Sequence, residues 1–153
     1  MTAPRTEPDP AAVRTVAPGD VKVNRRRGGE MRVLLSPVTA EATSGFMGTL
    51  TLAPGEYVSE HLHPYSEEFL CVTGGRARLR LGGPDGTYRE LGAGEAVMVP
   101  IGLRHRLENA GTEPLTAVFH LSPLAPRPDL GHVDTEEPPR AAEPQPQVGE
   151  RAR

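Results

Sequence analysis

The clearest pattern of apolar and polar positions is the strict alternation of arginine with alanine or leucine across Arg76–Leu81. Side chains of a β-strand point alternately to its two faces, so the alanine and the two leucines would face a core and the arginines would face water. This pattern predicts a half-buried strand of an antiparallel sheet. Turns that contain glycine or proline flank it, and further short apolar stretches of strand length occur at residues 31–35, 45–52, 68–72, 87–91, 96–99, 104–107 and 115–121.

Many short strands and turns, with no helical periodicity longer than a turn or two, predict an all-β sandwich or barrel. The 153 residues suffice for one domain with a sizeable core, but not for two ordinary domains. We expect a disordered arm over residues 1–20, a barrel domain over residues 21–135 and a disordered tail over residues 136–153. Both ends are rich in proline and poor in apolar side chains, so burial there would not offset the entropy lost on ordering.

The overall charge narrows the class of function. A net charge of -3 and a pI near 6.0 give no general attraction to nucleic acid or to anionic membranes, so neither is an expected partner. No apolar run approaches the ~20 residues that a membrane span needs, and the N-terminus lacks the apolar segment of a signal peptide. Cys71 has no second cysteine in the sequence with which to form a disulfide. We therefore expect a cytoplasmic protein.

The histidines of residues 55–75 predict a metal site. His61 and His63 are two residues apart on a predicted strand, so they project from the same face and can hold one metal ion together. The returning strand near Glu68 would bring a carboxylate beside them, and a second apolar stretch downstream offers His105. Imidazole and carboxylate ligands suit zinc, iron, nickel, manganese or copper.

The identity of the fourth ligand stays open between Glu68 and His120. Both neighbours of His120 on its strand are apolar, so alternation alone does not say which way its side chain points. A buried imidazole without a partner is costly, so we expect His120 to face the cavity, either as a ligand or hydrogen-bonded to Glu68. If His120 is the ligand, Glu68 is free to act as a base. His132 and the run Arg25–Arg27 are interpreted as solvated.

The two histidine-containing stretches resemble both sequence signatures of the cupin family. Residues 55–75 follow the spacing G-x5-H-x-H-x4-E-x6-G, and residues 94–109 follow G-x5-P-x-G-x2-H-x3-N. The spacing from Glu67 to Gly74 also satisfies a looser form of the first signature. The resemblance implies a double-stranded β-helix of the jelly-roll type and frequent dimerisation. It also implies a divalent metal held by His61, His63, Glu68 and His105. Zinc is the first expectation, with iron, nickel and manganese as alternatives.

A narrower resemblance covers roughly residues 25–135. The segments that carry it are RRGGEMRVLLSP, ATSGFMG, HPYSEEFL, MVPIGLRHR and VFHLSPLAPRPDLGHVDTE. They are similar to the small single-domain cupins encoded with bacterial type II aromatic polyketide synthases, such as those of tetracenomycin and spore-pigment clusters. This resemblance implies a polyketide cyclase of antibiotic biosynthesis, acting on a polyketide chain that is free or carried on an acyl carrier protein.

We therefore expect a metal-dependent cyclase that promotes an intramolecular aldol condensation followed by loss of water. The metal would polarise a keto oxygen as a Lewis acid, and Glu68 or a metal-bound water would take the α-proton. The same motifs also fit two other functions, an Fe(II)-dependent cupin oxygenase and a non-catalytic small-molecule-binding cupin.

Overall fold

The computed structural model describes residues 5–145 and 151–152. Within these residues the chain forms ten strands, one short helix and three single-turn 3-10 helices. The strands are β1 (Glu30–Leu35), β2 (Phe46–Leu52), β3 (Tyr57–Leu62), β4 (Glu67–Gly74), β5 (Arg76–Leu81), β6 (Thr87–Gly92), β7 (Ala96–Val99), β8 (His105–Asn109), β9 (Leu115–Ser122) and β10 (Val133–Asp134). The helices are α1 (Pro37–Ala40), η1 (Pro10–Ala12), η2 (Pro18–Asp20) and η3 (Pro128–Leu130).

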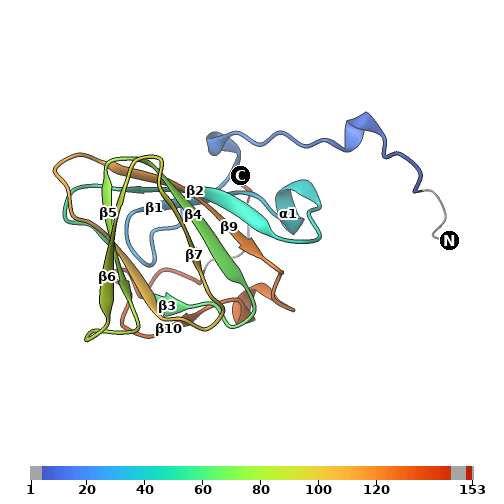
Figure 1. Ribbon diagram of the computed structural model, residues 1–153. Coiled ribbons are helices and arrows are strands. Elements are labelled where there is room, and N and C mark those ends of the chain that lie inside the picture. The colour runs from blue at the N-terminus through green and yellow to red at the C-terminus, as the bar shows by residue number, and fades with distance from the viewer. Residues whose placement is uncertain (1–4, 146–150, 153) are drawn as a thin grey trace.

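The strands form two antiparallel sheets of five strands each. One sheet has the order β1-β2-β9-β4-β7 and the other has the order β10-β3-β8-β5-β6. The two sheets face one another and curve into a barrel (Figure 1). The expectation of an all-β jelly-roll barrel is therefore confirmed.

Alternation along the strands decides which side chains enter the barrel. On β9 every second residue from Leu115 to Leu121 is buried, and the residues between them are only half-buried. On β5, Ala77 and Leu79 lie in the same core, as the sequence pattern predicts. Arg80 differs from the prediction that it faces water. It lies on the outer face of its sheet, but it is only 9% exposed because it forms an ion pair with the carboxylate of Glu60.

A β-bulge in β3 turns both Val58 and His61 toward the interior of the barrel. The register of β3 against β8 shifts between Val58 and His61. Residues three apart in a regular strand point to opposite faces, but the extra residue of a bulge lets both of these side chains line the same cavity. Glu60, within the bulge, is 2% exposed, and its Oε2 accepts a hydrogen bond from Arg80 at 2.9 Å.

The chain beyond β10 lies against the outer face of the second sheet, where we had expected a disordered tail from residue 136. A carboxylate oxygen of Glu136 accepts hydrogen bonds from the backbone N–H of Glu60 and from Arg106. Arg26 donates to the carbonyls of Ala141 and Glu143. These contacts anchor residues 136–143, whereas residues 146–150 and 153 of the predicted tail lie outside the described residues.

The N-terminal arm leads away from the barrel in Figure 1. Residues 5–15 are exposed, and the arm meets the barrel through an ion pair of 2.9 Å between Arg14 and Glu41. The proposed disorder of residues 1–20 stays a prediction. Among the residues that the structure describes, no helix is long and apolar enough to cross a membrane.

Candidate metal centre

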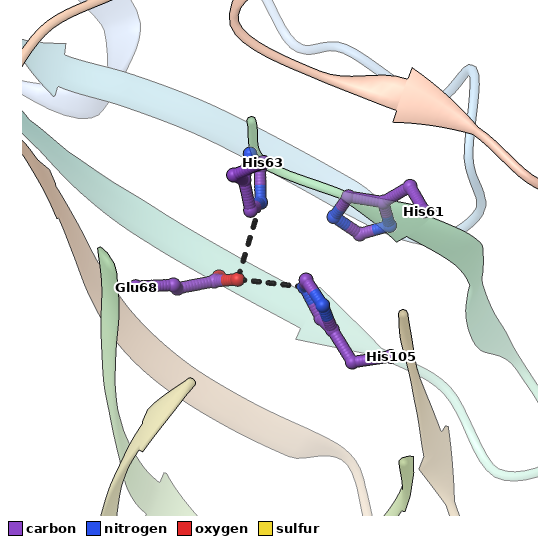
Figure 2. A group of neighbouring side chains, drawn as sticks. All are labelled: His61, His63, Glu68 and His105. Atoms are coloured by element: carbon purple, nitrogen blue, oxygen red, sulfur yellow. Dashed lines mark ion pairs between the residues drawn. The ribbon is translucent and has the colours of Figure 1, made fainter. Parts of the chain in front are cut away.

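Four side chains from three strands converge inside the barrel (Figure 2). His61 lies on β3, His63 follows that strand directly, Glu68 lies on β4 and His105 begins β8. Each contributes one potential ligand atom, and these four atoms lie within 4.8 Å of one another. The sequence predicted that these four residues would meet, and the β3–β8 register brings His61 directly opposite His105.

The backbone fixes the orientation of each imidazole. In His61, His63 and His105 the Nδ1 atom lies 2.8, 3.1 and 2.9 Å from the carbonyl oxygens of Ser59, Gly131 and Leu103, respectively. A carbonyl can only accept, so Nδ1 carries a proton in each ring, and Nε2 is the nitrogen that can bind a metal once it is deprotonated. All three rings thereby present a metal-binding nitrogen, held by the kind of outer contact that orients histidine ligands in metalloproteins.

The candidate ligand atoms of His63, Glu68 and His105 lie close together without forming well-aligned hydrogen bonds to one another. Oε2 of Glu68 lies 3.3 Å from Nε2 of His63 and 2.8 Å from Nε2 of His105. None of these three atoms is exposed or has a well-aligned hydrogen bond. Buried polar atoms without aligned partners are costly, and a divalent cation would satisfy all of them at once. Three neutral imidazoles and one carboxylate fit zinc and other first-row divalent metals.

The electrostatics of the cluster favour a neutral His61 and an ionised Glu68. Burial alone would lower the pKa of His105, but its contact with Glu68 outweighs burial and raises this pKa, so a metal would have to displace a proton from His105. Burial lowers the pKa of His61 well below its usual value, and the neighbouring imidazoles lower it further, so this ring is neutral at neutral pH. Burial alone would raise the pKa of Glu68, but its contacts with His105 and His63 outweigh burial and hold this pKa well below its usual value. Glu68 is therefore a carboxylate at neutral pH.

The structure places Glu68, and not Glu67, in the cluster, but it does not place His120 there. Glu67 and Glu68 are neighbours on β4, so they point to opposite faces, and Glu68 is the one in the cluster. The prediction that His120 faces the cavity is wrong in this structure. Phe119 and Leu121 line the cavity, so His120 between them points to the outer face, where its ring lies 6.0 Å from the ring of Phe69.

The cluster lies at the end of an apolar cavity of about 70 Å³. Apart from the cluster, Arg27 and His132, its lining is apolar: Met31, Val33, Phe46, Leu50, Val58, Leu70, Leu79, Val97, Val99, Leu107, Phe119 and Leu121. A second pocket of about 290 Å³ lies beside it, between α1 and the segment from Leu124 to His132. The two share Phe46, His63 and His132, so the outer pocket is a path from the surface toward the cluster.

Two lining residues were missed by sequence reasoning. Arg27 is 4% exposed and pairs with Asp134, although we had interpreted it as part of a solvated loop. His132 is half-buried, and its Nε2 lies 2.6 Å from the side-chain oxygen of Gln145. Burial, followed by the charge of Arg27, lowers the pKa of His132 to about 4. Both positions lie far from the histidine motifs along the chain, and no local pattern marks either one as facing a cavity.

Comparison with known proteins places the geometry in context. The family model described as "Cupin domain" matches residues 48–121. Polyketide synthase CurC of Streptomyces cyaneus is 54% identical over 82% of this chain and 79% of its own length. Protein SchB of Streptomyces halstedii is 56% identical over 81% and 88%. Tetracenomycin polyketide synthase protein TcmJ of Streptomyces glaucescens is 47% identical over 91% of each chain.

Solved structures share the fold at low sequence identity. An oxalate decarboxylase from Lactobacillus farciminis in complex with formate superposes with a TM-score of 0.64 at 22% identity, over 75% of this chain and 33% of the other. A Bacillus subtilis oxalate decarboxylase, whose description names Mn(II) centres, superposes with a TM-score of 0.60 at 24% identity, over 71% of this chain and 28% of the other. Both likenesses concern the fold alone.

Proposed function

Because the chain belongs to the cupin family and two of its relatives over most of its length, CurC and TcmJ, are named as polyketide synthase proteins, we propose that it is a metal-dependent polyketide cyclase. It would close a ring in a poly-β-keto chain by intramolecular aldol condensation and loss of water. The observation that carries this proposal is the buried cluster of three oriented imidazoles and one carboxylate in an otherwise apolar cavity.

His61, His63, His105 and Glu68 would hold the metal, with zinc as the first candidate and manganese, iron and nickel as alternatives. With His120 on the outer face, Glu68 is the remaining candidate for the fourth ligand. When bound, the metal supplies a Lewis acid that polarises a keto oxygen of the substrate.

Glu68 is also our candidate for the general base. Its Oε2 faces the histidines, whereas Oε1 has no hydrogen-bond or ion-pair partner among the described residues. Oε1 is therefore available to accept a proton from substrate. A carboxylate whose pKa lies below its usual value is a weak base. The proton it takes must accordingly be an acidic one, such as that of a methylene group flanked by two carbonyls, which poly-β-keto chains contain at every second carbon.

The proposed step transfers the α-proton to Glu68 and joins the resulting carbon nucleophile to a second keto carbon of the same chain. The oxygen of that keto group takes up a proton and becomes a hydroxyl group, which leaves as water together with a neighbouring α-proton. The cavity walls would contribute by holding the two carbons close together. Such positioning can lower an activation barrier by up to about 7–11 kcal/mol.

The size of the cavity limits how much of the substrate reaches the metal. The inner cavity is far smaller than the ~300–1,000 Å³ of typical ligand pockets, and the outer pocket nearly reaches that range. We propose that only the reacting segment enters the inner cavity. The rest of the chain would lie in the outer pocket, along Leu124–Pro128, where it could remain attached to an acyl carrier protein.

The test is cyclisation of a synthetic poly-β-keto thioester by purified, metal-loaded protein, with and without oxygen. A cyclase converts the substrate equally well in both atmospheres and loses this activity when the metal is removed. Turnover only in the presence of oxygen would identify an oxygenase. Tight substrate binding without any turnover would identify a binding protein.

A further inference from the structure

We propose that Arg27 is a substrate-binding residue. It would hold the anionic oxygen of a 1,3-dicarbonyl enolate while the substrate lies beside the cluster of four candidate metal ligands. This inference rests on the proposed function and names the part of the substrate that the cavity recognises. Arg27 lies outside residues 48–121, which match the family model, so the shared cupin motifs do not account for it.

The position of Arg27 is unusual for a basic side chain. It is 4% exposed and lines the same cavity as the four cluster residues. Buried charges in proteins are paired or serve a function, because removing a charge from water is expensive. The nearby run of basic residues does not share this position: Arg25 is solvent-accessible and pairs with Glu30 at 3.1 Å.

The surrounding residues fix Arg27 but leave part of its guanidinium available. Its Nε donates to Oδ1 of Asp134 at 2.8 Å, and its Nη2 makes a long contact of 3.5 Å with the side chain of Gln145. A guanidinium carries five N–H donors. Among the described residues these two contacts are the only hydrogen bonds of the Arg27 side chain, so several of its donors remain for a ligand. Asp134 also pairs with Arg26 at 3.4 Å, so Arg27 is not needed to neutralise that carboxylate.

The remaining lining favours an enolate over a more strongly hydrated anion. Of the described residues that line the cavity, His132 is the one polar residue besides Arg27 and the cluster, and its pKa of about 4 leaves it neutral at neutral pH. A dicarboxylate would bring two charges and many acceptor sites into this apolar space, where few donors could satisfy them. The enolate of a 1,3-dicarbonyl carries one charge spread over two oxygens. One oxygen would bind at the cluster of metal-ligand residues, and the other would accept hydrogen bonds from Arg27.

The fixed charge of Arg27 also stabilises the enolate as it forms. A fixed guanidinium in a cavity of low dielectric stabilises that charge more strongly than water would. Arg27 would therefore lower the pH at which a bound dicarbonyl ionises.

The test uses acetylacetone, a small 1,3-dicarbonyl whose enolate has its own ultraviolet absorbance. Binding to the full chain is measured by calorimetry, and enolate formation is followed by absorbance against pH, with and without zinc. We expect Arg27→Gln to weaken binding at least about tenfold and to move the ionisation midpoint up by about one pH unit. The matched control is Arg25→Gln, which makes the same charge change in the same loop outside the cavity and should behave as wild type.

Metal content and melting temperature are measured for each variant. If Arg27→Gln does not fold, the double variant Arg27→Gln/Asp134→Asn replaces it, because the two amides can then hydrogen-bond to each other where the guanidinium and the carboxylate did. Wild-type-like binding by the folded Arg27 variant, equal loss in Arg25→Gln, or tighter binding of malonate than of acetylacetone by wild type would each overturn the inference. In each of these cases cyclisation by the metal-loaded wild type would still decide the proposed function separately.

Discussion

At the scale of single residues, each cluster histidine divides its two ring nitrogens between the fold and the site. In each ring Nδ1 lies within hydrogen-bond reach of a backbone carbonyl, and Nε2 faces the cluster. His120 is built differently, since its strand turns its ring to the outer face beside Phe69. We therefore expect that replacing a cluster histidine weakens metal binding and that replacing His120 does not.

We expect His105→Ala to reduce metal affinity by more than ~100-fold, because it removes a direct ligand and even outer contacts of metal sites are worth ~10–100-fold. His120→Ala serves as the control and should retain about one metal per subunit. Elemental analysis after dialysis against a weak chelator measures both. Equal metal loss in the two variants would contradict the assignment of ligands.

His132 is predicted to make the unfolding free energy of the metal-free protein depend on pH. Its folded-state pKa of about 4 lies below the ordinary value of 6.5, so between these values the unfolded chain binds a proton that the folded protein does not. Stability therefore falls as the pH drops from 6.5 toward 4. Between pH 7 and pH 5 this histidine should account for a loss of about 2 kcal/mol in unfolding free energy.

Urea denaturation of wild type and His132→Asn at both pH values checks this contribution. The loss of stability on acidification should be about 2 kcal/mol smaller in the variant. Since the cluster histidines are the same in both proteins, their effect cancels in the comparison. An identical pH dependence in the two proteins would show that His132 titrates normally.

At the scale of elements, strand alternation predicted most of the fold and failed at identifiable places. It placed Ala77 and Leu79 in the core, and the spaced motifs predicted which four side chains meet. It was misapplied at His120, where only the apolar neighbours Phe119 and Leu121 were weighed. Over the whole of β9 the alternation is clear, because the buried face carries Leu115, Ala117, Phe119 and Leu121 and the face of His120 carries Thr116, Val118 and Ser122. It also missed the bulge in β3, since nothing in the local sequence marks where a strand gains an extra residue.

The bulge creates a buried ion pair whose loss should be measurable. Glu60→Ala leaves the buried Arg80 with only the longer contact of 3.6 Å to Glu136 and removes the side-chain acceptor for Thr135, so we expect a cost of about 2–3 kcal/mol. The matched control is Glu90→Ala, which breaks the exposed pair with Arg76 at 3.7 Å and should cost less than ~1 kcal/mol. Chemical denaturation measures the unfolding free energy of both variants. Similar losses of stability would mean that the ion pair between Glu60 and Arg80 is effectively solvated.

At the scale of the whole molecule, the segments outside the barrel motifs complete the cavity. Arg27 precedes β1, and Asp134 and Gln145, which hold it, come from the other end of the chain. These contacts join segments distant in sequence, and each segment is too polar to suggest a packed element by itself. The motifs could therefore predict the four cluster residues but not Arg27, which lines the same cavity.

Truncation distinguishes the two ends. Ending the chain after Thr135 removes Glu136 and the carbonyls that Arg26 contacts, so we expect the melting temperature to fall by at least about 5 °C. Deleting residues 1–18 should change it by less than about 2 °C, because this arm is largely exposed. Differential scanning calorimetry measures both, and a stable protein ending at Thr135 would show that the contacts of residues 136–143 contribute little.

The pairing of His61 with His105 across β3 and β8 also has a kinetic consequence. The strands that carry these ligands are distant in sequence, so the complete ligand set exists only after slow, non-local pairing has taken place. A metal bound by ligands on both strands would lose its last protein ligands only when this pairing or the turn beside it opens, even where a small chelator enters through the outer pocket. The rate at which a chelator extracts the metal should then stop rising with chelator concentration, and its plateau would report how often the barrel opens.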